Sequence, residues 1–280
     1  MMKEPVRSQK YCSAIVQKRA QSFYSALKFL PKDKRHCLYS LYAFARLADD
    51  IVDGQVSHMG LDTLREKLDI VFSSSIQPDQ NDFMASLSRT VFDYEIPRKL
   101  FDDLLDGMEM DQGKIHFQTW EETKDYCYKA ASTVGLMCVE VFEYNDPNAR
   151  IYAHDLGIAM QLTNMIRDLK EDHSLGRQYL PQEDFDGFGL TYDELVSGQK
   201  SDAMNRFMRF QIDRAHVYYE SAKNLYPMVN KKTRYCPKAL SLIYQKVLET
   251  IKQNPAAAIR KKVSLSTASK LWIVTKSFMK

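Results

Sequence analysis

Residues Gln161 to Pro181, QLTNMIRDLKEDHSLGRQYLP, carry the pattern that decides the fold. Asn164, Asp168 and Asp172 are spaced four residues apart, so on a helix they share one face. A neighbouring apolar stripe at helical spacing is formed by Leu162, Met165, Ile166 and Leu169. The two sets are centred roughly 110° apart around the helix. The pattern therefore predicts a helix that packs through one face and presents carboxylates to a cavity with the other.

A second acidic set lies upstream, in LYAFARLADDIVDG (residues 41–54). The members that fall on one face of a predicted helix are Tyr42, Arg46, Asp49 and Asp53. Two helices that each offer carboxylates at this spacing can hold magnesium between them, because magnesium takes oxygen ligands and completes its shell with water and phosphate oxygens. Arg167 and Arg177 lie beside the downstream set, where they can bind phosphate oxygens that the metal leaves.

The alternative for each set is a solvated acidic face, the ordinary environment of such residues on a helix. Two observations favour a site. Asp49 and Asp50 stand among apolar residues, where uncompensated carboxylates are costly. Both acidic sets also have an arginine beside them. We therefore interpret them as a metal and phosphate site.

The bulk composition is that of a globular protein rich in helices. Of its 280 residues, 45% are hydrophobic and 27% are charged, while glycine and proline number only 10 and 9. So few turn-forming residues favour long helices over a β protein. The length suits one large helical domain or two small ones, and we expect a single domain that spans residues 1–280.

The net charge of +3 is unevenly distributed. From Lys231 onward there are twelve basic residues and one acid, Glu249, whereas the preceding part carries a net charge of −8. The basic end can contact an anionic membrane surface or an anionic substrate. No nucleic-acid-binding motif accompanies this charge, so nucleic acid is not expected as a partner. A tail packed on the domain is the favoured reading, and peripheral membrane contact is the alternative.

The cysteines indicate a reducing compartment. There are five, scattered and without a C-x-x-C pair, which is typical of reduced, buried thiols. The N-terminus has no apolar core segment of a signal peptide, and there is no run of eighteen apolar residues. We therefore expect a cytoplasmic protein without a membrane span.

Periodicity and punctuation predict a series of helices. The expected helices cover residues 8–30, 34–52, 61–72, 82–94, a segment opened by Pro97, 120–144, 149–172, 191–196, 201–225 and 238–252, with a loop at 176–189. The sequence leaves the roles of two segments open. The acidic cluster in residues 102–111 is either a solvated helix face or part of a site. The small residues 130–135 allow close approach by another helix or by a ligand.

Four segments in this order resemble the squalene and phytoene synthase family of head-to-head prenyl transferases. They are YAFARLADDIVD (42–53), DGMEMD (106–111), YCYKAASTVG (126–135) and QLTNMIRDLKED (161–172) followed by GRQYLP. The match extends roughly from Phe23 to Ile251. The resemblance implies an all-α, single-domain isoprenoid-synthase bundle around a central cavity.

The resemblance also implies roles for particular residues. Two or three magnesium ions are expected on the metal ligands Asp49, Asp53, Asn164, Asp168 and Asp172. The expected catalytic residues are Tyr42, Arg46, Tyr126 and Arg167. The expected substrate-binding residues are Ser22, Phe23, Val134, Gln161, Asn164, Arg177 and Tyr244. Two departures stand out: Ser132 replaces a glycine, which is expected to crowd the prenyl channel, and residues 19–21 lack a histidine that is common there.

The implied reaction joins two identical prenyl diphosphates, farnesyl or geranylgeranyl, through a cyclopropyl diphosphate to a linear hydrocarbon. The product is dehydrosqualene, phytoene or squalene. No G-x-G-x-x-G fingerprint follows a strand, which favours an ending by proton loss without NADPH. The same residues also permit two alternatives. One is a phosphatase that releases the free alcohol, and the other is a non-catalytic partner that binds prenyl lipids. Chain length and oligomeric state are left open.

Overall fold

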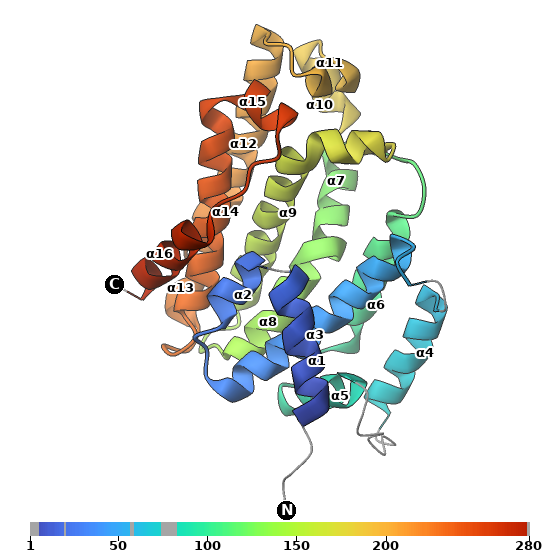
Figure 1. The fold of residues 1–280 in the computed structure, drawn as a ribbon, viewed down its shortest axis with the longest axis vertical. Coiled ribbons are helices and arrows are strands. Elements are labelled where there is room, and N and C mark those ends of the chain that lie inside the picture. Colours follow the sequence, from blue (N-terminus) through green and yellow to red (C-terminus); the bar gives the residue numbers. More distant parts are fainter. Residues whose placement is uncertain (1–5, 20, 57–58, 74–82, 279–280) are drawn as a thin grey trace, which may run out of the picture.

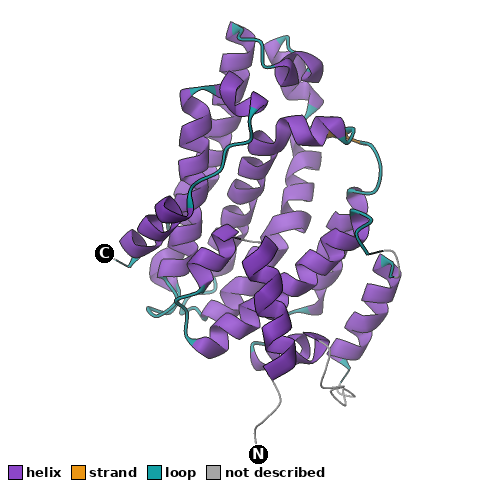
Figure 2. Cartoon of the chain, in the orientation of Figure 1, coloured by secondary structure: helices purple, strands orange, loops and turns teal. Residues whose placement is uncertain are grey.

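The computed structural model describes residues 6–19, 21–56, 59–73 and 83–278. The chain is a bundle of helices, which confirms the predicted fold class (Figures 1 and 2). A single two-stranded parallel ladder, β1 with β2, is the only sheet within these ranges. The N-terminal half consists of α1 (Val6–Arg19), α2 (Gln21–Leu27), α3 (Lys32–Val52), α4 (Leu61–Phe72), α5 (Phe83–Asp93), α6 (Arg98–Met110), β1 (Ile115–His116), α7 (Trp120–Cys127), the π-helix η1 (Tyr128–Ser132) and α8 (Thr133–Phe142). The rest comprises α9 (Ala149–Ser174), β2 (Arg177–Gln178), α10 (Gln182–Phe188), α11 (Tyr192–Ser197), α12 (Asp202–Ala222), α13 (Leu225–Met228), α14 (Tyr235–Gln253), α15 (Pro255–Arg260) and α16 (Thr267–Ser277).

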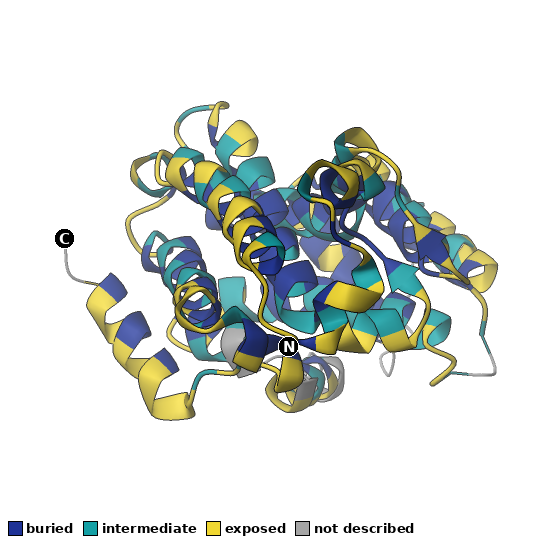
Figure 3. Cartoon of the chain, turned by 90° about the horizontal axis from the view of Figure 1, so that it is seen from above, coloured by how far each residue is buried: buried dark blue, intermediate teal, exposed yellow. Residues whose placement is uncertain are grey.

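Helix α9 is the central element of the bundle. It packs against η1, α8, α12 and α14 (Figure 1). The stripe predicted from the sequence is its packing face, since each of its four residues is at most 2% exposed. Because this face is apolar, the helix docks in one orientation and its carboxylate face turns away from the packed side. Buried residues run through the middle of the bundle between exposed outer faces (Figure 3).

Local sequence signals set most helix ends. Thr119 and Thr191 each form a capping box with the glutamate three residues later, which satisfies free N–H groups of α7 and α11. Pro31 and Pro97 directly precede α3 and α6, and Pro97 opens its helix as the sequence predicted. Gly198 ends α11 in the left-handed conformation.

Three expectations about the elements are wrong in detail. The segment expected as one helix at 8–30 is two helices, and the segment at 120–144 is interrupted by η1. The expected loop at 176–189 contains β2 and α10, because Pro181 starts α10 and the fully buried Phe185 anchors it. The basic C-terminal end contains α15 and α16, and α16 packs on α14 and α2. This agrees with the favoured reading of a packed tail.

Ser132 does not crowd a channel. Its side chain is fully buried, and its hydroxyl donates to the backbone oxygen of His154 on α9 at 2.8 Å. Gly157 faces it so closely that a Cβ there would lie 2.4 Å from the Ser132 Cα. The serine therefore fills the contact between η1 and α9, and the smaller Ala130 and Ala131 line the cavity instead.

Candidate active site

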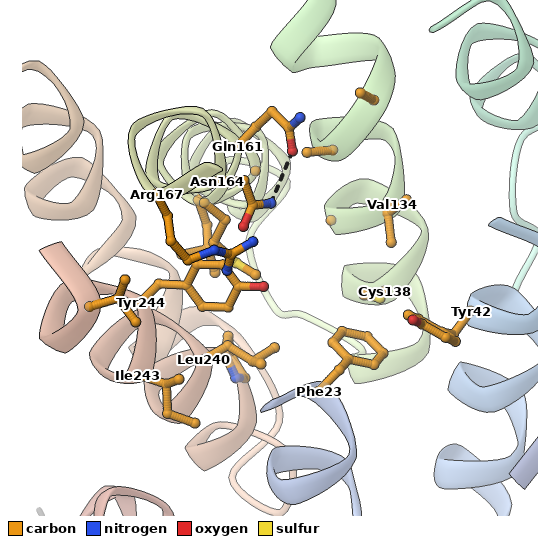
Figure 4. A pocket seen from close by; sticks show the side chains of 18 of the residues that line it. Phe23, Tyr42, Val134, Cys138, Gln161, Asn164, Arg167, Leu240, Ile243 and Tyr244 are labelled. Atoms are coloured by element: carbon orange, nitrogen blue, oxygen red, sulfur yellow. Dashed lines mark hydrogen bonds between the residues drawn. The ribbon is translucent and has the colours of Figure 1, made fainter. Parts of the chain in front are cut away.

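A cavity of about 770 Å³ lies between α8, α9 and α14. One end is polar, where α9 contributes Gln161, Asn164 and Arg167 (Figure 4). The other end is apolar, lined by residues such as Phe142 and Leu240. An amphipathic substrate with an anionic head and a long apolar chain matches this division.

Seven of the predicted site residues line this cavity: Phe23, Tyr42, Val134, Gln161, Asn164, Arg167 and Tyr244. The rings of Phe23 and Tyr42 stack at 5.4 Å and form one wall, with Val134 beside them on α8 (Figure 4). Burial raises the pKa of Tyr42 to about 12, so its hydroxyl stays protonated at neutral pH. Ser22 belongs to α2, but its side chain lies outside the described residues.

The predicted carboxylates lie beyond the polar end of the cavity. Helix α3 continues from Tyr42 through Arg46 to Asp49 and Asp53, and α9 continues from Arg167 to Asp168 and Asp172. None of these carboxylates is among the described residues that line the cavity. The acidic residues therefore form a rim outside an apolar chamber.

Arg46 neutralises the rim on α3. Its Nη1 lies 2.7 Å from Asp49 Oδ2, and the same guanidinium pairs with Asp50. Burial raises the pKa of the Asp49 carboxyl to about 6, and repulsion by Asp53 and Asp111 adds to the rise. A cation bound beside Asp49 would therefore stabilise its ionised carboxylate.

The rim on α9 has two basic partners. Arg167 Nε donates to Asp168 Oδ1 at 2.8 Å, and Lys262 Nζ lies 3.0 Å from the same oxygen. Lys262 also contacts Glu171 at 2.7 Å. Burial raises the pKa of Asp172 to about 7, with repulsion by Asp168 as the next cause. The carboxylates on α9, like those on α3, therefore concentrate negative charge that bound cations would neutralise.

Arg177 lies between the two acidic sets. Its Nη2 is 3.9 Å from Asp53 Oδ1 at the end of α3 and donates to the Asp111 backbone oxygen at 3.0 Å. Its charge also lowers the pKa of Asp172 on α9. One guanidinium acts on both sets, so the structure brings the two predicted acidic helices together at this point.

Tyr126 stands behind the rim and not in the cavity wall. Its hydroxyl donates to Asp111 Oδ2 at 3.0 Å, and Tyr179 donates to the other oxygen at 2.7 Å. The two rings stack at 4.7 Å, and Asp111 is 8% exposed. The sequence left the role of Asp111 open as part of the acidic cluster at 102–111, and it did not identify Tyr179, although both lie in segments quoted above, DGMEMD and GRQYLP. The other acids of the 102–111 cluster pair with surface bases or Tyr128.

Three lysines of the cavity wall were also missed: Lys18, Lys262 and Lys270. The basic run at 260–262 was the available signal, but nothing in the sequence shows which lysine reaches α9. In the structure, the segment between α15 and α16 crosses the bundle and brings Lys262 to Asp168. Arg260, in the same basic run, donates to the Gly198 backbone oxygen at 2.8 Å.

The donor set fits magnesium. The Oδ1 atom of Asn164 is buried without a hydrogen-bond partner, so a carbonyl oxygen is free for a cation. The carboxylates of both rims supply the hard oxygen ligands that magnesium prefers. Among the described residues, no three His, Cys, Asp or Glu side chains are already gathered closely enough to hold a metal ion by themselves. Substrate phosphates and water would complete the shell.

Acid titration of the rim gives a stability prediction. The raised pKa means that folded Asp172 holds its proton more tightly than the unfolded chain does. Its ionisation therefore costs folding free energy, and metal-free stability should fall as pH rises from about 4 to about 7. Asp172→Asn should remove this cost and stabilise the metal-free protein at pH 8 by about 1 kcal/mol. Thermal unfolding at pH 5 and pH 8 checks this; an equal or lower melting temperature for the variant at pH 8 would contradict it.

The helical bundle with an acidic rim over an apolar cavity belongs to the class of isoprenoid synthases. A family model described as squalene/phytoene synthase matches residues 16–269. The chain belongs to this family of prenyl transferases, and the reaction type is head-to-head condensation of prenyl diphosphates.

Individual relatives agree. The chain is 32% identical to a 15-cis-phytoene synthase of Synechococcus elongatus over 93% of this chain and 89% of the relative. It is 30% identical to a phytoene synthase of Mycobacterium tuberculosis over 96% and 90%. Among solved structures, a dehydrosqualene synthase in complex with ligand has a TM-score of 0.86 and 31% identity over 96% of this chain and 95% of that one. The squalene synthase HpnC from Alicyclobacillus acidocaldarius has a TM-score of 0.79 and 25% identity, with 88% and 93% covered.

Proposed function

We propose that the whole chain, residues 1–280, acts as one magnesium-dependent enzyme that joins two identical prenyl diphosphates to a linear hydrocarbon. The observation that supports this most strongly is the position of the acidic rim, directly beyond the polar end of an apolar cavity. A diphosphate can lie at the rim while its prenyl chain lies in the cavity. The family comparisons favour coupling over the phosphatase and over a non-catalytic binding partner.

Two or three magnesium ions would be held by the four rim carboxylates together with Asn164 at the polar end of the cavity; the carboxylates are Asp49, Asp53, Asp168 and Asp172. Bound magnesium would neutralise charge that develops on the departing diphosphate. Enzymes of this class are typically metal-dependent. Arg46 and Arg167 already contact the rim carboxylates, and a cation there would free both guanidinium groups for phosphate oxygens. Arg177 and Lys262 are placed to do the same.

The cavity protects the reacting carbocation. Apolar walls exclude water, which would otherwise capture an allylic cation as an alcohol. The stacked faces of Phe23 and Tyr42 can stabilise positive charge at the head of the prenyl chain. Tyr126 acts as a positioning residue, because it holds Asp111 next to Arg177. Loss of a proton ends the reaction, without NADPH.

Product identification tests the proposal. Purified protein is incubated with magnesium and, separately, with farnesyl and geranylgeranyl diphosphate, and the organic extract is analysed by mass spectrometry. A coupled hydrocarbon from at least one substrate is expected. Free alcohol without hydrocarbon would establish the phosphatase instead, and tight substrate binding without turnover would establish the non-catalytic partner.

A cytoplasmic enzyme with a water-insoluble product benefits from contact with a bilayer. Within the described ranges, the model holds no helix with the length and hydropathy of a membrane span. Helix α16 exposes Leu271 and Trp272, and Phe278 at its end meets the exposed Phe29 edge to face at 6.1 Å. The Lys276 ammonium lies 4.5 Å from the Trp272 ring centroid. Aromatic rings beside lysines are typical of surfaces that enter the headgroup region.

Vesicle binding should therefore depend on this surface. Trp272→Glu is expected to lower co-sedimentation with vesicles rich in anionic lipid by about fivefold or more, because it replaces an inserting ring with a repelled charge. Phe92→Glu is a matched control, since Phe92 is 51% exposed on the distant α5. Equal binding by both variants and the unaltered protein would contradict the prediction.

A further inference from the structure

Helix α16 has a largely polar inner face, although it packs on the bundle. The residues that it buries lie on one stripe at helical spacing, and they are Lys270, Ile273, Val274 and Ser277. Two of the four are polar or charged, whereas the outer face exposes Leu271 and Trp272. A lysine in the core-facing stripe departs from the pattern of a packed helix, and such departures are typical of functional positions.

The Lys270 side chain is buried in the cavity wall without a counterion. It is 8% exposed and lines the same cavity as Arg167. Burial lowers the pKa of its ammonium, and repulsion by Arg167 lowers it further. Among the described residues, this ammonium has no hydrogen-bond or ion-pair partner. Because a buried charge without a partner is costly, Lys270 opposes the docking of its own helix.

The segment that leads into α16 is held by few contacts. Residues 262–265 cross the bundle between α15 and α16 (Figure 1). They form no backbone hydrogen bond with the described part of the chain. Their anchors are the ion pairs of Lys262 with the rim and the packing of Val263 and Leu265 on the core. A segment without backbone hydrogen bonds can act as a hinge when α16 loses its own contacts.

The contacts that keep α16 in place are few. It packs on α14 and α2 through Ile273 and Val274, and the ring of Phe278 at its end stacks on Tyr235 with centroids 4.0 Å apart. Phe278 is nevertheless 55% exposed. The unpaired ammonium of Lys270 acts against these contacts. The docked and undocked positions of α16 should therefore differ by a free energy small enough for a bound ligand to change the balance.

An anion at the polar end of the cavity would change that balance. A diphosphate beside Arg167 also comes within reach of the Lys270 ammonium, since the two charges already act on each other. The anion replaces one repulsion with two attractions, because each cation gains a partner. A ligand that binds the docked form more tightly than the undocked form shifts the equilibrium toward docking.

We infer that α16 is a conformational switch: a diphosphate anion at the polar end of the cavity holds the helix docked through Lys270, and departure of the anion releases it. The inference goes beyond the proposed coupling function and requires only that the polar end binds a diphosphate. Release of α16 withdraws Lys270 from the cavity wall and frees the neighbouring Val263 and Leu265. The apolar chamber then opens beside the exposed Trp272, and the hydrocarbon leaves after the charged product has gone.

Hydrogen exchange of α16 tests this without turnover. The metal-free protein is placed in deuterated buffer with and without inorganic pyrophosphate, which supplies the anion without a prenyl chain, and the α16 peptides are analysed by mass spectrometry. At about ten times the calorimetric Kd of pyrophosphate, exchange should slow by about tenfold, because the anion binds the docked form. Peptides of α5, which lies elsewhere in the bundle, should not change.

Lys270→Met removes the buried charge and keeps an unbranched apolar side chain. Exchange of α16 in this variant should already be slow without pyrophosphate and should not respond to it. Lys276→Met is the matched control, because Lys276 lies on the outer face of the same helix, with its ammonium 4.5 Å from the Trp272 ring centroid. This control should keep the full response to pyrophosphate.

Equal slowing by pyrophosphate in the unaltered protein and in Lys270→Met would overturn the inference, since the anion would then act elsewhere. Unchanged α16 exchange in the unaltered protein would overturn it as well. Lys270→Gln is a second neutral variant if circular dichroism shows that Lys270→Met is not folded. A protein that forms hydrocarbon but fails this test refutes the switch alone, and one that passes it but forms no hydrocarbon refutes the proposed function alone.

Discussion

Asp168→Asn should lower the kcat of hydrocarbon formation by about 10³-fold or more, as expected when a ligand of the ion that stabilises the leaving group is lost. Asp168 is 16% exposed and shares one carboxylate oxygen with Arg167 and Lys262. Removal of its charge leaves both cations without their shared partner, and it takes away one of the ligands proposed for magnesium. The magnesium concentration needed for half-maximal rate should rise at the same time.

Glu171→Gln is the control for this experiment. Glu171 lies on the same helix and pairs with the same Lys262 at 2.7 Å, but its side chain is 60% exposed. Loss of an exposed ion pair costs little, so its activity should stay within about threefold. Hydrocarbon formation is measured for both variants after circular dichroism shows that each is folded. An equal loss of hydrocarbon formation in Asp168→Asn and Glu171→Gln would contradict the prediction. It would show that activity depends on the contacts with Lys262 and not on Asp168 as a metal ligand.

Arg167→Gln should lower kcat/KM by about 10²- to 10³-fold, the range for loss of one donor to developing charge. Arg167 lines the polar end of the cavity, pairs with Asp168 and lies beside the Tyr244 hydroxyl. It is thus the basic residue that links the rim to the prenyl chamber. Arg167→Lys keeps the positive charge but lacks the planar guanidinium that can donate two parallel hydrogen bonds, so its kcat/KM should lie between those of Arg167→Gln and the unaltered protein.

Arg150→Gln provides a matched comparison on the same helix. Arg150 pairs with Glu140 at 2.6 Å near the other end of α9 and is 47% exposed. The activity of this variant should remain within about twofold of the unaltered protein, because the pair lies away from the carboxylate rim and the glutamine can still donate a hydrogen bond to Glu140. Steady-state kinetics with separate kcat and KM values decide the result. A Gln variant at position 167 that retains full activity would remove the arginine from the proposed phosphate contacts.

Periodicity predicted the parts of the fold that depend on repeated packing. The apolar stripe of α9 and the bounds of α4 were predicted correctly, because every turn of these helices places apolar residues toward the core and polar residues toward solvent. Features that depend on one particular contact could not be predicted from periodicity. The π-helix η1 arises where Ser132 meets Gly157, a contact between segments that no local pattern connects. The helix α10 was hidden by glycines at 187 and 189 that suggested a loop.

The same distinction applies to the site. Spacing identified the carboxylates of α3 and α9 because four-residue intervals place them on one face. It could not identify their partners, since Lys262 approaches Asp168 from the far end of the chain. The sequence also could not show how deeply each side chain is buried. Tyr126 was expected near the reaction centre, but its hydroxyl donates to Asp111 behind the rim. Tertiary contacts therefore supply what the motifs leave out.

Metal counting with a substrate analogue tests the central claim most directly. Manganese binding is titrated by electron paramagnetic resonance in the presence of a prenyl thiodiphosphate, which resists ionisation. The unaltered protein should bind two or three ions, and Asp49→Asn and Asp168→Asn should each lower that number, because ligands from both helices hold the ions over one diphosphate. Full binding in both variants, or no binding in the unaltered protein, would contradict the account.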